Sequence, residues 1–214
     1  MDQYSTVCGC GTGEITEKKS RFIADVFPVA SEEEAASHIE KIRKQYWDAR
    51  HHCWAYVIGR NPGTERMSDD GEPAGTAGKP ILEVIKGRRL TDVLVVVTRY
   101  FGGTLLGTGG LVRAYTSAAA EGLSRAGIMR KIKGVRLRIG TDYTGLGKIQ
   151  YILARRGVCV LDTVYTDRAE ILAAVSDGEL ESLRKEITEE TSGRAAVETE
   201  GTCWLSAAEQ ETEP

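Results

Sequence analysis

A strand, a glycine-rich segment and a helix follow one another without a break in residues 91–127, and this succession constrains the fold most. Residues 91–100 contain an unbroken run of valine and leucine at 93–97, which predicts a buried β-strand. Residues 111–126 are rich in alanine and leucine and predict a helix, which Gly127 ends. The segment between them, 101–110, includes five glycines and predicts a loop. We therefore expect a chain of mixed α and β structure.

The residues before this stretch predict further strands and helices. Weak alternation with β-branched residues predicts strands at 3–12 and 20–29, joined by a turn at 13–19. Ser31 and Glu34 have the spacing of a capping box, so a helix is expected from there to about Tyr46. An apolar segment rich in β-forming residues predicts a buried strand at 53–59, and a short helix is expected at 81–86.

A second pattern begins after the short basic segment 129–134. Strands are expected at 135–141, 158–165, 169–175 and 195–205, and helices at 143–156 and 178–191. The resulting order, βαββαβ, is typical of the ferredoxin-like unit. The sequence thus predicts an α+β protein with two domains, residues 1–133 and 134–206. The acidic tail at 207–214 is expected to be disordered.

Charge and apolar patterning narrow the classes of function. The 214 residues carry a formal net charge of −3, so binding to nucleic acid would need a local basic patch. The longest apolar runs have only the length of strands, and residues 1–4 lack the basic and apolar regions of a signal peptide. We therefore expect a cytoplasmic protein without a membrane partner.

The cysteines do not indicate a disulfide framework, because their number is five and their spacing is scattered. Cys8 and Cys10 could supply two thiolates to a metal, but the sequence shows no second pair that would complete a zinc site. Free thiols are the favoured interpretation, and neither a metal nor a cofactor is predicted.

The glycine-rich segment is a candidate anion site. Glycines allow backbone N–H groups to approach a ligand closely, and a helix N-terminus adds unpaired donors and a partial positive charge. Arginines flank the segment on both sides and could add charge-assisted contacts. The candidate anion-binding residues are Arg99, Gly102, Gly103, Gly107, Thr108, Gly109, Gly110 and Arg113. The alternative is a tight connection in which the glycines only permit packing.

The segment 68–80, SDDGEPAGTAGKP, is a second candidate site. Its carboxylates Asp69, Asp70 and Glu72 could bind Mg²⁺ or act as an acid–base pair. Asp-Gly and proline also form turns, in which aspartates bond their own backbone. We favour a structural or binding role and predict no catalytic residue. The loop is expected to lie against 102–110 and form one concave rim, with candidate residues His52, Asp69, Asp70, Glu72, Thr76 and Lys79.

Four blocks of sequence closely resemble the IMPACT family. They are HCWAY at 52–56, the acidic segment at 68–80, TRYFGG at 98–103 and LGTGGLVRAY at 106–115. The resemblance covers about residues 5–127, and the second part resembles the small C-terminal domain of bacterial, YigZ-type members. It implies an N-terminal domain similar to the second domain of a ribosomal small-subunit protein, with a left-handed βαβ fold. It also implies a ferredoxin-like C-terminal domain similar to domain five of elongation factor G.

The resemblance also implies a link to translation, because eukaryotic members of the family are translational regulators that associate with ribosomes. The favoured hypothesis is a non-enzymatic regulator that binds RNA, the ribosome or a regulatory protein through the glycine-rich rim. Basic residues near the domain boundary could add phosphate contacts; they are Arg130, Lys131, Lys133 and Arg136. One alternative is a Mg²⁺-dependent enzyme that acts on a phosphorylated small molecule or nucleotide. Another is a protein–protein adaptor.

Overall fold

The computed structural model describes residues 3–60 and 63–206 and contains two compact units. The chain divides between Arg130 and Lys131, and the N-terminal unit comprises Tyr4–Arg130. This division falls inside β7 (Ile128–Thr141), and so does the boundary between residues 133 and 134 that the sequence predicts. The tail at 207–214, predicted to be disordered, lies outside the described residues.

Five antiparallel strands form the sheet of the N-terminal unit, in the order β2-β3-β6-β4-β5. They are β2 (Gly11–Glu17), β3 (Ser20–Pro28), β6 (Val93–Tyr100), β4 (His51–Ile58) and β5 (Thr64–Ser68). The apolar run at 93–97 is the central strand, β6. Because side chains alternate along a strand, Val95 and Val96 face opposite sides, and both are fully buried. An unbroken apolar run is therefore what a sheet covered on both faces requires.

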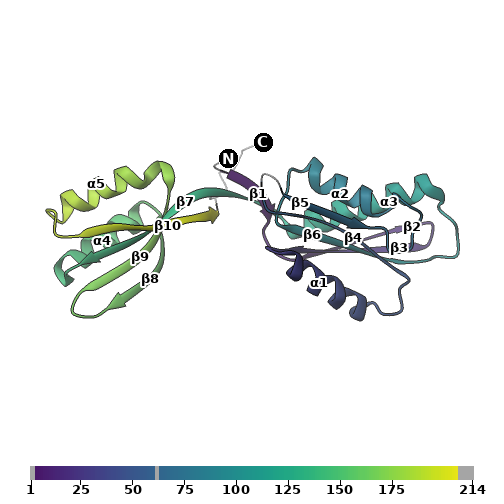
Figure 1. The fold of residues 1–214 in the computed structure, drawn as a ribbon, viewed down its shortest axis with the longest axis horizontal. Helices are drawn as coiled ribbons and strands as arrows, with labels where there is room; N and C mark the ends of the chain where they lie inside the picture. The colour runs from purple at the N-terminus through teal and green to yellow at the C-terminus, as the bar shows by residue number, and fades with distance from the viewer. Residues whose placement is uncertain (1–2, 61–62, 207–214) are drawn as a thin grey trace. The chain divides into compact units, whose positions relative to one another are not determined.

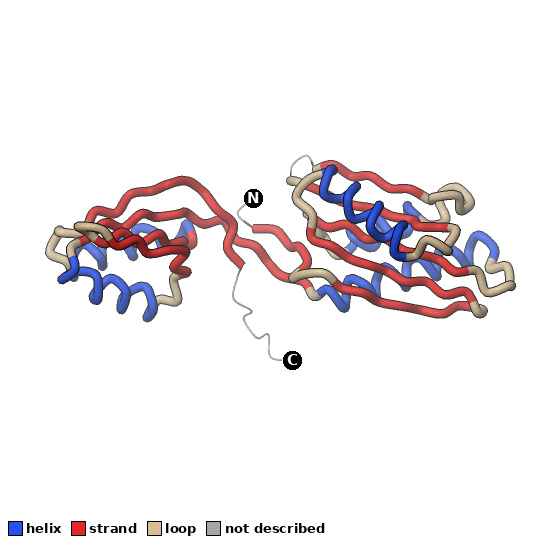
Figure 2. The backbone as a smooth tube through the Cα atoms, turned by 90° about the horizontal axis from the view of Figure 1, so that it is seen from below, coloured by secondary structure: helices blue, strands red, loops and turns tan. Residues whose placement is uncertain are grey.

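Helices cover both faces of this sheet and make the unit three layers thick (Figure 1). α1 (Glu32–Gln45) packs on one face through Ala35, Ile39 and Ile42. α2 (Gly78–Gly87) and α3 (Gly107–Ala126) pack on the other face. Figure 2 shows α1 in front of the sheet and the other two helices behind it. The larger apolar core lies between the sheet and the α2–α3 layer.

The predicted capping box at the start of α1 is present. Glu34 N donates to Ser31 Oγ at 3.2 Å, and Ala30 N donates to Glu34 Oε2 at 2.7 Å. The first bond satisfies an N–H group that the first turn of a helix leaves unpaired, and the second ties the preceding residue to the same turn.

The first strands differ from the sequence prediction. The sequence predicts one strand at 3–12, whereas β1 (Gln3–Val7) and β2 are separate, and β2 occupies most of the predicted turn. The turn lies at Lys18 and Lys19, which adopt φ values of 44° and 68°. Lysine seldom takes this left-handed conformation, so the composition does not reveal the turn. The sequence also does not predict β5, because the strand is short, polar and at the edge of the sheet.

Two helices begin earlier than the sequence predicts. α2 begins at Gly78 instead of residue 81, and α3 begins at Gly107 instead of residue 111. Glycine costs a helix about 1 kcal/mol relative to alanine, so a glycine-rich stretch does not predict a helix start. The segment Gly107-Thr108-Gly109-Gly110, predicted as part of a loop, is therefore the first turn of α3.

The C-terminal unit has the βαββαβ order that the sequence predicts. Its elements are β7, α4 (Tyr143–Arg155), β8 (Cys159–Tyr165), β9 (Ala169–Ser176), the short 3₁₀ helix η1 (Asp177–Glu179), α5 (Leu180–Glu190) and β10 (Ala196–Ser206). The strands β8, β9, β7 and β10 are neighbours in that order, and all of them pair antiparallel. Alternate residues of β7 and β9 form a separate core with α4 and α5, which includes Leu137, Ile149, Ile171 and Leu183.

Two glycines of the β6–α3 segment provide a matched test of the fold. A Cβ added to Gly102 would lie 2.0 Å from the carbonyl carbon of Lys19, whereas one added to Gly109 would meet only the tip of Arg113 at 3.9 Å. We expect Gly102→Ala to destabilise the N-terminal unit by about 1–3 kcal/mol through overpacking. Gly109→Ala should leave stability unchanged or raise it by up to about 1 kcal/mol. Urea unfolding followed by circular dichroism measures both effects, and equal midpoints for the two variants would contradict this packing.

Candidate functional site

Asp69 ties the acidic loop to the start of α2. Its carboxylate accepts hydrogen bonds from the backbone N–H groups of Gly75 (2.8 Å), Ala77 (3.0 Å) and Gly78 (2.8 Å). Ala77 is the N-cap of α2 and has no side chain that could accept such a bond. Asp69 therefore caps the helix from a distance and closes the loop on itself.

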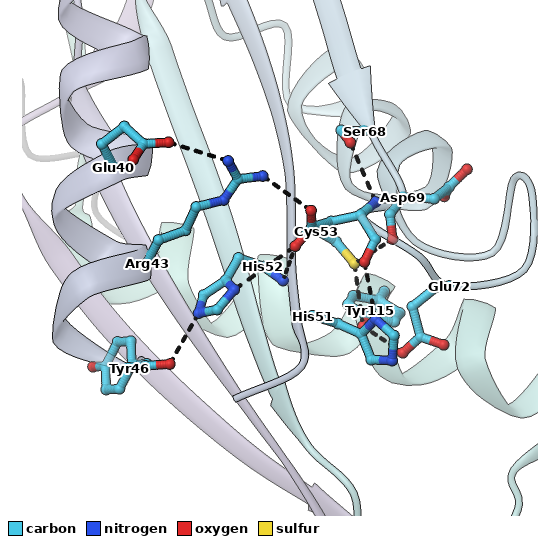
Figure 3. A network of polar contacts seen from close by, with 11 residues as sticks. Glu40, Arg43, Tyr46, His51, His52, Cys53, Ser68, Asp69, Glu72 and Tyr115 are labelled. Carbon is cyan, nitrogen blue, oxygen red and sulfur yellow. Dashed lines mark hydrogen bonds and ion pairs between the residues drawn. The ribbon is translucent and has the colours of Figure 1, made fainter. Parts of the chain in front are cut away.

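Asp70 connects the loop to β4 and α1. Its carboxylate accepts from His52 N at 2.7 Å and from Arg43 Nη2 at 2.9 Å, and its carbonyl oxygen lies 2.9 Å from His51 Nδ1. Because a carbonyl oxygen can only accept, His51 carries a proton on Nδ1. The same argument assigns a proton to His52 Nε2, which lies 3.1 Å from Tyr46 O. Figure 3 shows how these contacts join α1, β4 and the loop.

Glu72 is a buried carboxylate of the loop, with 4% of its side chain exposed. Its Oε1 accepts from Arg99 Nη1 at 2.7 Å and from the Tyr115 hydroxyl at 2.8 Å. Cys53 Sγ lies 3.3 Å from the same hydroxyl (Figure 3). Burial raises the pKa of both Cys53 and Tyr115, so the thiol stays protonated at neutral pH. A protonated, buried thiol is a packing group and not a nucleophile.

The three carboxylates of the acidic loop are thus all engaged by donors of the protein. This arrangement leaves the loop poorly suited to bind Mg²⁺ or to move protons, because each carboxylate would first have to give up its present partners. Among residues 3–60 and 63–206, no group of three or more His, Cys, Asp or Glu side chains is placed to hold a metal ion. The geometry favours a structural role for Asp69, Asp70 and Glu72.

A pocket of about 670 Å³ opens beside this network, at the end of the sheet where β4 begins and β6 ends. His51 and Arg99 are direct partners across these two strands. The pocket is lined by Asp48, Ala49, Arg50, His51, Arg99, Tyr100, Phe101 and Leu105. We call it the β4–β6 pocket.

Arg99 is the central cation of the β4–β6 pocket. Only 7% of its side chain is exposed, and its guanidinium carbon lies 5.4 Å from the ring centre of Phe22 and 5.6 Å from that of Phe101. One side of the guanidinium is paired with Glu72, but the buried Nε has no hydrogen-bond partner in the part of the chain that the structure describes. Such an unpaired buried donor is unusual in a folded protein.

The glycines predicted to bind an anion have different surroundings. Gly102 N donates to Ser20 Oγ at 3.1 Å, and the residue packs closely on Lys19. Gly103 and Gly107 adopt positive φ values of 82° and 70°, a conformation that favours glycine. Close packing at Gly102 and the positive φ values at Gly103 and Gly107 are therefore structural reasons for glycine at these positions.

The first turn of α3 is open to solvent at Gly107, Thr108 and Gly109, and Arg113 lies beside Gly109. Leu106, the N-cap, offers no side-chain acceptor. The structure therefore brings Arg113 to this turn, whereas Arg99 is held by Glu72 and lines the β4–β6 pocket.

The other residues predicted for the acidic-loop rim do not join the β4–β6 pocket. Thr76 is buried, and its hydroxyl donates to Pro73 O at 2.7 Å. Lys79 lines a different pocket of about 440 Å³ between α2 and α3, together with Val84 and Val112. Glu72 of the acidic loop contacts Arg99 of β6 and Tyr115 of α3. The pocket lined by Arg99 and the pocket lined by Lys79 are separate, and the single rim with 102–110 stays a prediction.

The basic residues predicted to bind nucleic acid lie on β7 and not in a flexible linker. Arg130 belongs to the N-terminal unit, and the other three belong to the C-terminal unit. Because side chains alternate along a strand, Arg136 points to the opposite side from Lys131 and Lys133. Lys131 Nζ donates to Ser206 Oγ at 3.1 Å, and Lys133 Nζ lies 3.4 Å from Asp177. The four cations therefore do not form one continuous patch.

Sequence reasoning does not identify residues 48–50 or the side chains of Phe101 and Leu105 as parts of a site. Phe101 and Leu105 lie in the β6–α3 segment and are 56% and 83% exposed. The sequence feature that could have indicated them is the presence of large apolar residues in the glycine-rich segment 101–110. Their proximity depends on the pairing of β4 with β6, which the sequence does not show.

Comparison with known proteins identifies the family. The Impact N-terminal domain model matches residues 18–123, and a second model, described as a domain of unknown function (DUF1949), matches residues 139–194. The IMPACT family member YvyE of Bacillus subtilis is 43% identical over 198 residues, which cover 92% of this chain and 91% of that protein. The chain belongs to the IMPACT family. Its Glu72–Arg99 network and the β4–β6 pocket both lie within the matched N-terminal domain.

Other IMPACT family members support this assignment over most of the chain. The Haemophilus influenzae member is 37% identical and covers 85% of this chain, and YigZ of Escherichia coli is 39% identical and covers 69%. A crystal structure described as that of a hypothetical protein is 31% identical, covers 92% of this chain and 97% of its own, and has a TM-score of 0.61. The two-domain α+β fold that the sequence predicts is therefore shared with relatives.

Removing the buried carboxylate of Glu72 should be costly. Glu72→Ala leaves Arg99 as a buried charge without its partner and also takes an acceptor from Tyr115. We expect a loss of about 3–5 kcal/mol in the free energy of unfolding, which is the usual cost of breaking a buried pair. Glu65→Ala is the matched control, because Glu65 forms an exposed pair with Lys86, and its urea midpoint should stay close to that of the parent protein. A similar midpoint for both variants would contradict the assigned role of Glu72.

The pKa of Asp69 predicts a dependence of stability on pH. Burial alone raises this pKa, but the three backbone donors outweigh burial and hold it below its ordinary value. Ionised Asp69 therefore stabilises the fold above the unfolded pKa of about 3.9, and this stabilisation disappears as pH falls through the lower folded value. Asp69→Asn should lower stability at pH 7 and reduce its decline below about pH 4. Thermal unfolding across pH tests this, and parallel curves for both proteins would oppose it.

Proposed function

We propose that this IMPACT family member is a non-enzymatic, translation-associated protein that binds RNA, free or within the ribosome, in the cytoplasm. The observation that carries the proposal is the β4–β6 pocket, in which the exposed ring of Phe101 lies beside the guanidinium of Arg99. Arg50 and His51 line the same pocket. Cationic and aromatic side chains together are the usual contacts of RNA phosphates and bases.

The distribution of charge at this end of the sheet supports the proposal. Strand pairing places Arg21 opposite Tyr100, so the β2–β3 turn with Lys18 and Lys19 lies at the same end as Arg50. Local cations are needed because the chain as a whole carries a net charge of −3. Asp48, the one carboxylate among the described residues that line the pocket, accepts a hydrogen bond from the Tyr100 hydroxyl at 2.8 Å.

The association with translation rests on the family. The shared N-terminal domain extends to eukaryotic proteins, among them the protein IMPACT homolog of Dictyostelium discoideum, which is 37% identical over 101 residues. No helix in the described part of the chain is long and apolar enough to cross a membrane. The competing hypothesis is that the main partner is a regulatory protein instead of RNA. The Mg²⁺-dependent enzyme has less support, because the loop carboxylates that it would use are engaged by Arg43, Arg99 and backbone donors.

RNA binding should depend on salt and on the cations at this end of the sheet. Fluorescence anisotropy with a labelled RNA of about ten nucleotides should show an affinity that falls about tenfold between about 50 and 200 mM KCl. Arg50→Gln and Lys19→Gln should each weaken binding, since each removes a phosphate contact. Lys86→Gln is the control, because Lys86 pairs with Glu65 at the opposite end of β4 from His51. No binding at low salt, or equal losses in all three variants, would refute the proposal.

A further inference from the structure

We propose that the β4–β6 pocket takes one unpaired base of a single-stranded RNA, with the base stacked on Phe101 and an adjacent phosphate near Arg50 and His51. The inference rests on the proposed RNA binding and adds the form of RNA that is recognised. It follows from four features of the pocket: its size, its aromatic wall, its fixed donors and its position at the end of a sheet.

The size of the pocket fits a single small unit. At about 670 Å³ it lies within the usual range of about 300–1,000 Å³ for pockets that enclose small molecules. One base with its sugar and phosphate is such a unit, whereas a duplex is far wider than the pocket. A duplex could therefore contact only the rim, and its bases would stay inside the helix.

Phe101 provides a surface on which a base can stack. The side chain lines the pocket and is 56% exposed. Because burial of a phenylalanine side chain is favourable, covering this ring with a ligand would be favourable as well. Leu105, which is 83% exposed, lines the same pocket. The guanidinium carbon of the buried Arg99 lies 5.6 Å from the centre of the Phe101 ring and helps to hold this ring in place. Unstacked bases bind to exposed aromatic rings.

The polar groups of the pocket are held in fixed positions before any ligand arrives. Glu72 holds one side of the Arg99 guanidinium, and the buried Nε–H remains without an acceptor among the described residues. The bond between His51 Nδ1 and Asp70 O orients the imidazole and leaves Nε2 as its second polar atom. Arg50 is exposed and supplies a charge for a phosphate. A nucleotide carries phosphate oxygens that suit this exposed cation.

The position of the pocket allows a strand to enter and leave. It lies where loops follow β6 and precede β4, with the basic β2–β3 turn at the same end of the sheet. A flexible single strand could place one base in the pocket while its neighbouring phosphates reach Lys18 or Lys19. A free mononucleotide would lack those additional contacts and should bind more weakly.

The test compares single-stranded and duplex RNA of the same sequence, each with 2-aminopurine as a fluorescent base. The single strand should bind the full-length protein at least about tenfold more tightly than the duplex or a mononucleotide, and its 2-aminopurine fluorescence should be quenched by stacking. Phe101→Ala should weaken binding at least about fivefold and remove the quenching, whereas Phe101→Trp should retain both. Tyr151→Ala, which removes an aromatic ring that is 66% exposed in the C-terminal unit, should change neither.

The outcomes separate this inference from the function on which it rests. If RNA binds but the duplex binds as tightly as the single strand, or Phe101→Ala binds and quenches like the parent protein, the inference is wrong and the proposed function stands. A mononucleotide that binds as tightly as the strand also overturns it. If no RNA binds, both fail. Thermal unfolding midpoints of the variants show whether a loss of binding arises from loss of the fold.

Discussion

The ion pair between Arg99 and Glu72 is the contact on which the arrangement of the N-terminal unit depends. Its side chains are 7% and 4% exposed, and it joins three segments that are far apart in sequence. Arg99 comes from the end of β6, Glu72 from the acidic loop, and Tyr115, which shares the same carboxylate oxygen, from α3. A buried pair of this kind contributes little net stability compared with an apolar replacement, but breaking it is costly. Its effect is to specify where the acidic loop and the pocket wall lie.

This pair also explains why a loop rich in carboxylates is suited to support and not to catalysis. Asp69 closes the loop and caps α2, Asp70 attaches it to β4 and α1, and Glu72 anchors it beneath the pocket. Each carboxylate is matched to donors of the protein, which favours a structural role for the loop. The side chains left available for a ligand are those that line the β4–β6 pocket beside it: Arg50, His51 and the exposed ring of Phe101. They can bind a ligand that offers acceptors and a flat apolar surface.

Much of the fold was predictable because the strongest signals are local. The apolar run of β6, the capping box of α1 and the βαββαβ order of the C-terminal unit all follow from patterns within a few residues. The early start of α3 was not predictable, because glycine disfavours helices and the segment at 107–110 contains three glycines. For the site, the sequence indicates Arg99 and Glu72 separately. Their pairing depends on tertiary contacts at a separation of 27 residues, and the role of residues 48–51 depends on the β4–β6 register.

The central claim is that RNA meets the chain at the end of the sheet where β6 ends and β4 begins. Ultraviolet crosslinking of the full-length protein to single-stranded RNA, followed by mass spectrometry of the crosslinked peptides, tests this claim most directly. The account predicts that crosslinks concentrate in peptides that contain His51 or Phe101, within the pocket lining. Crosslinks confined to β7 or to the C-terminal unit, with none in those peptides, would contradict it.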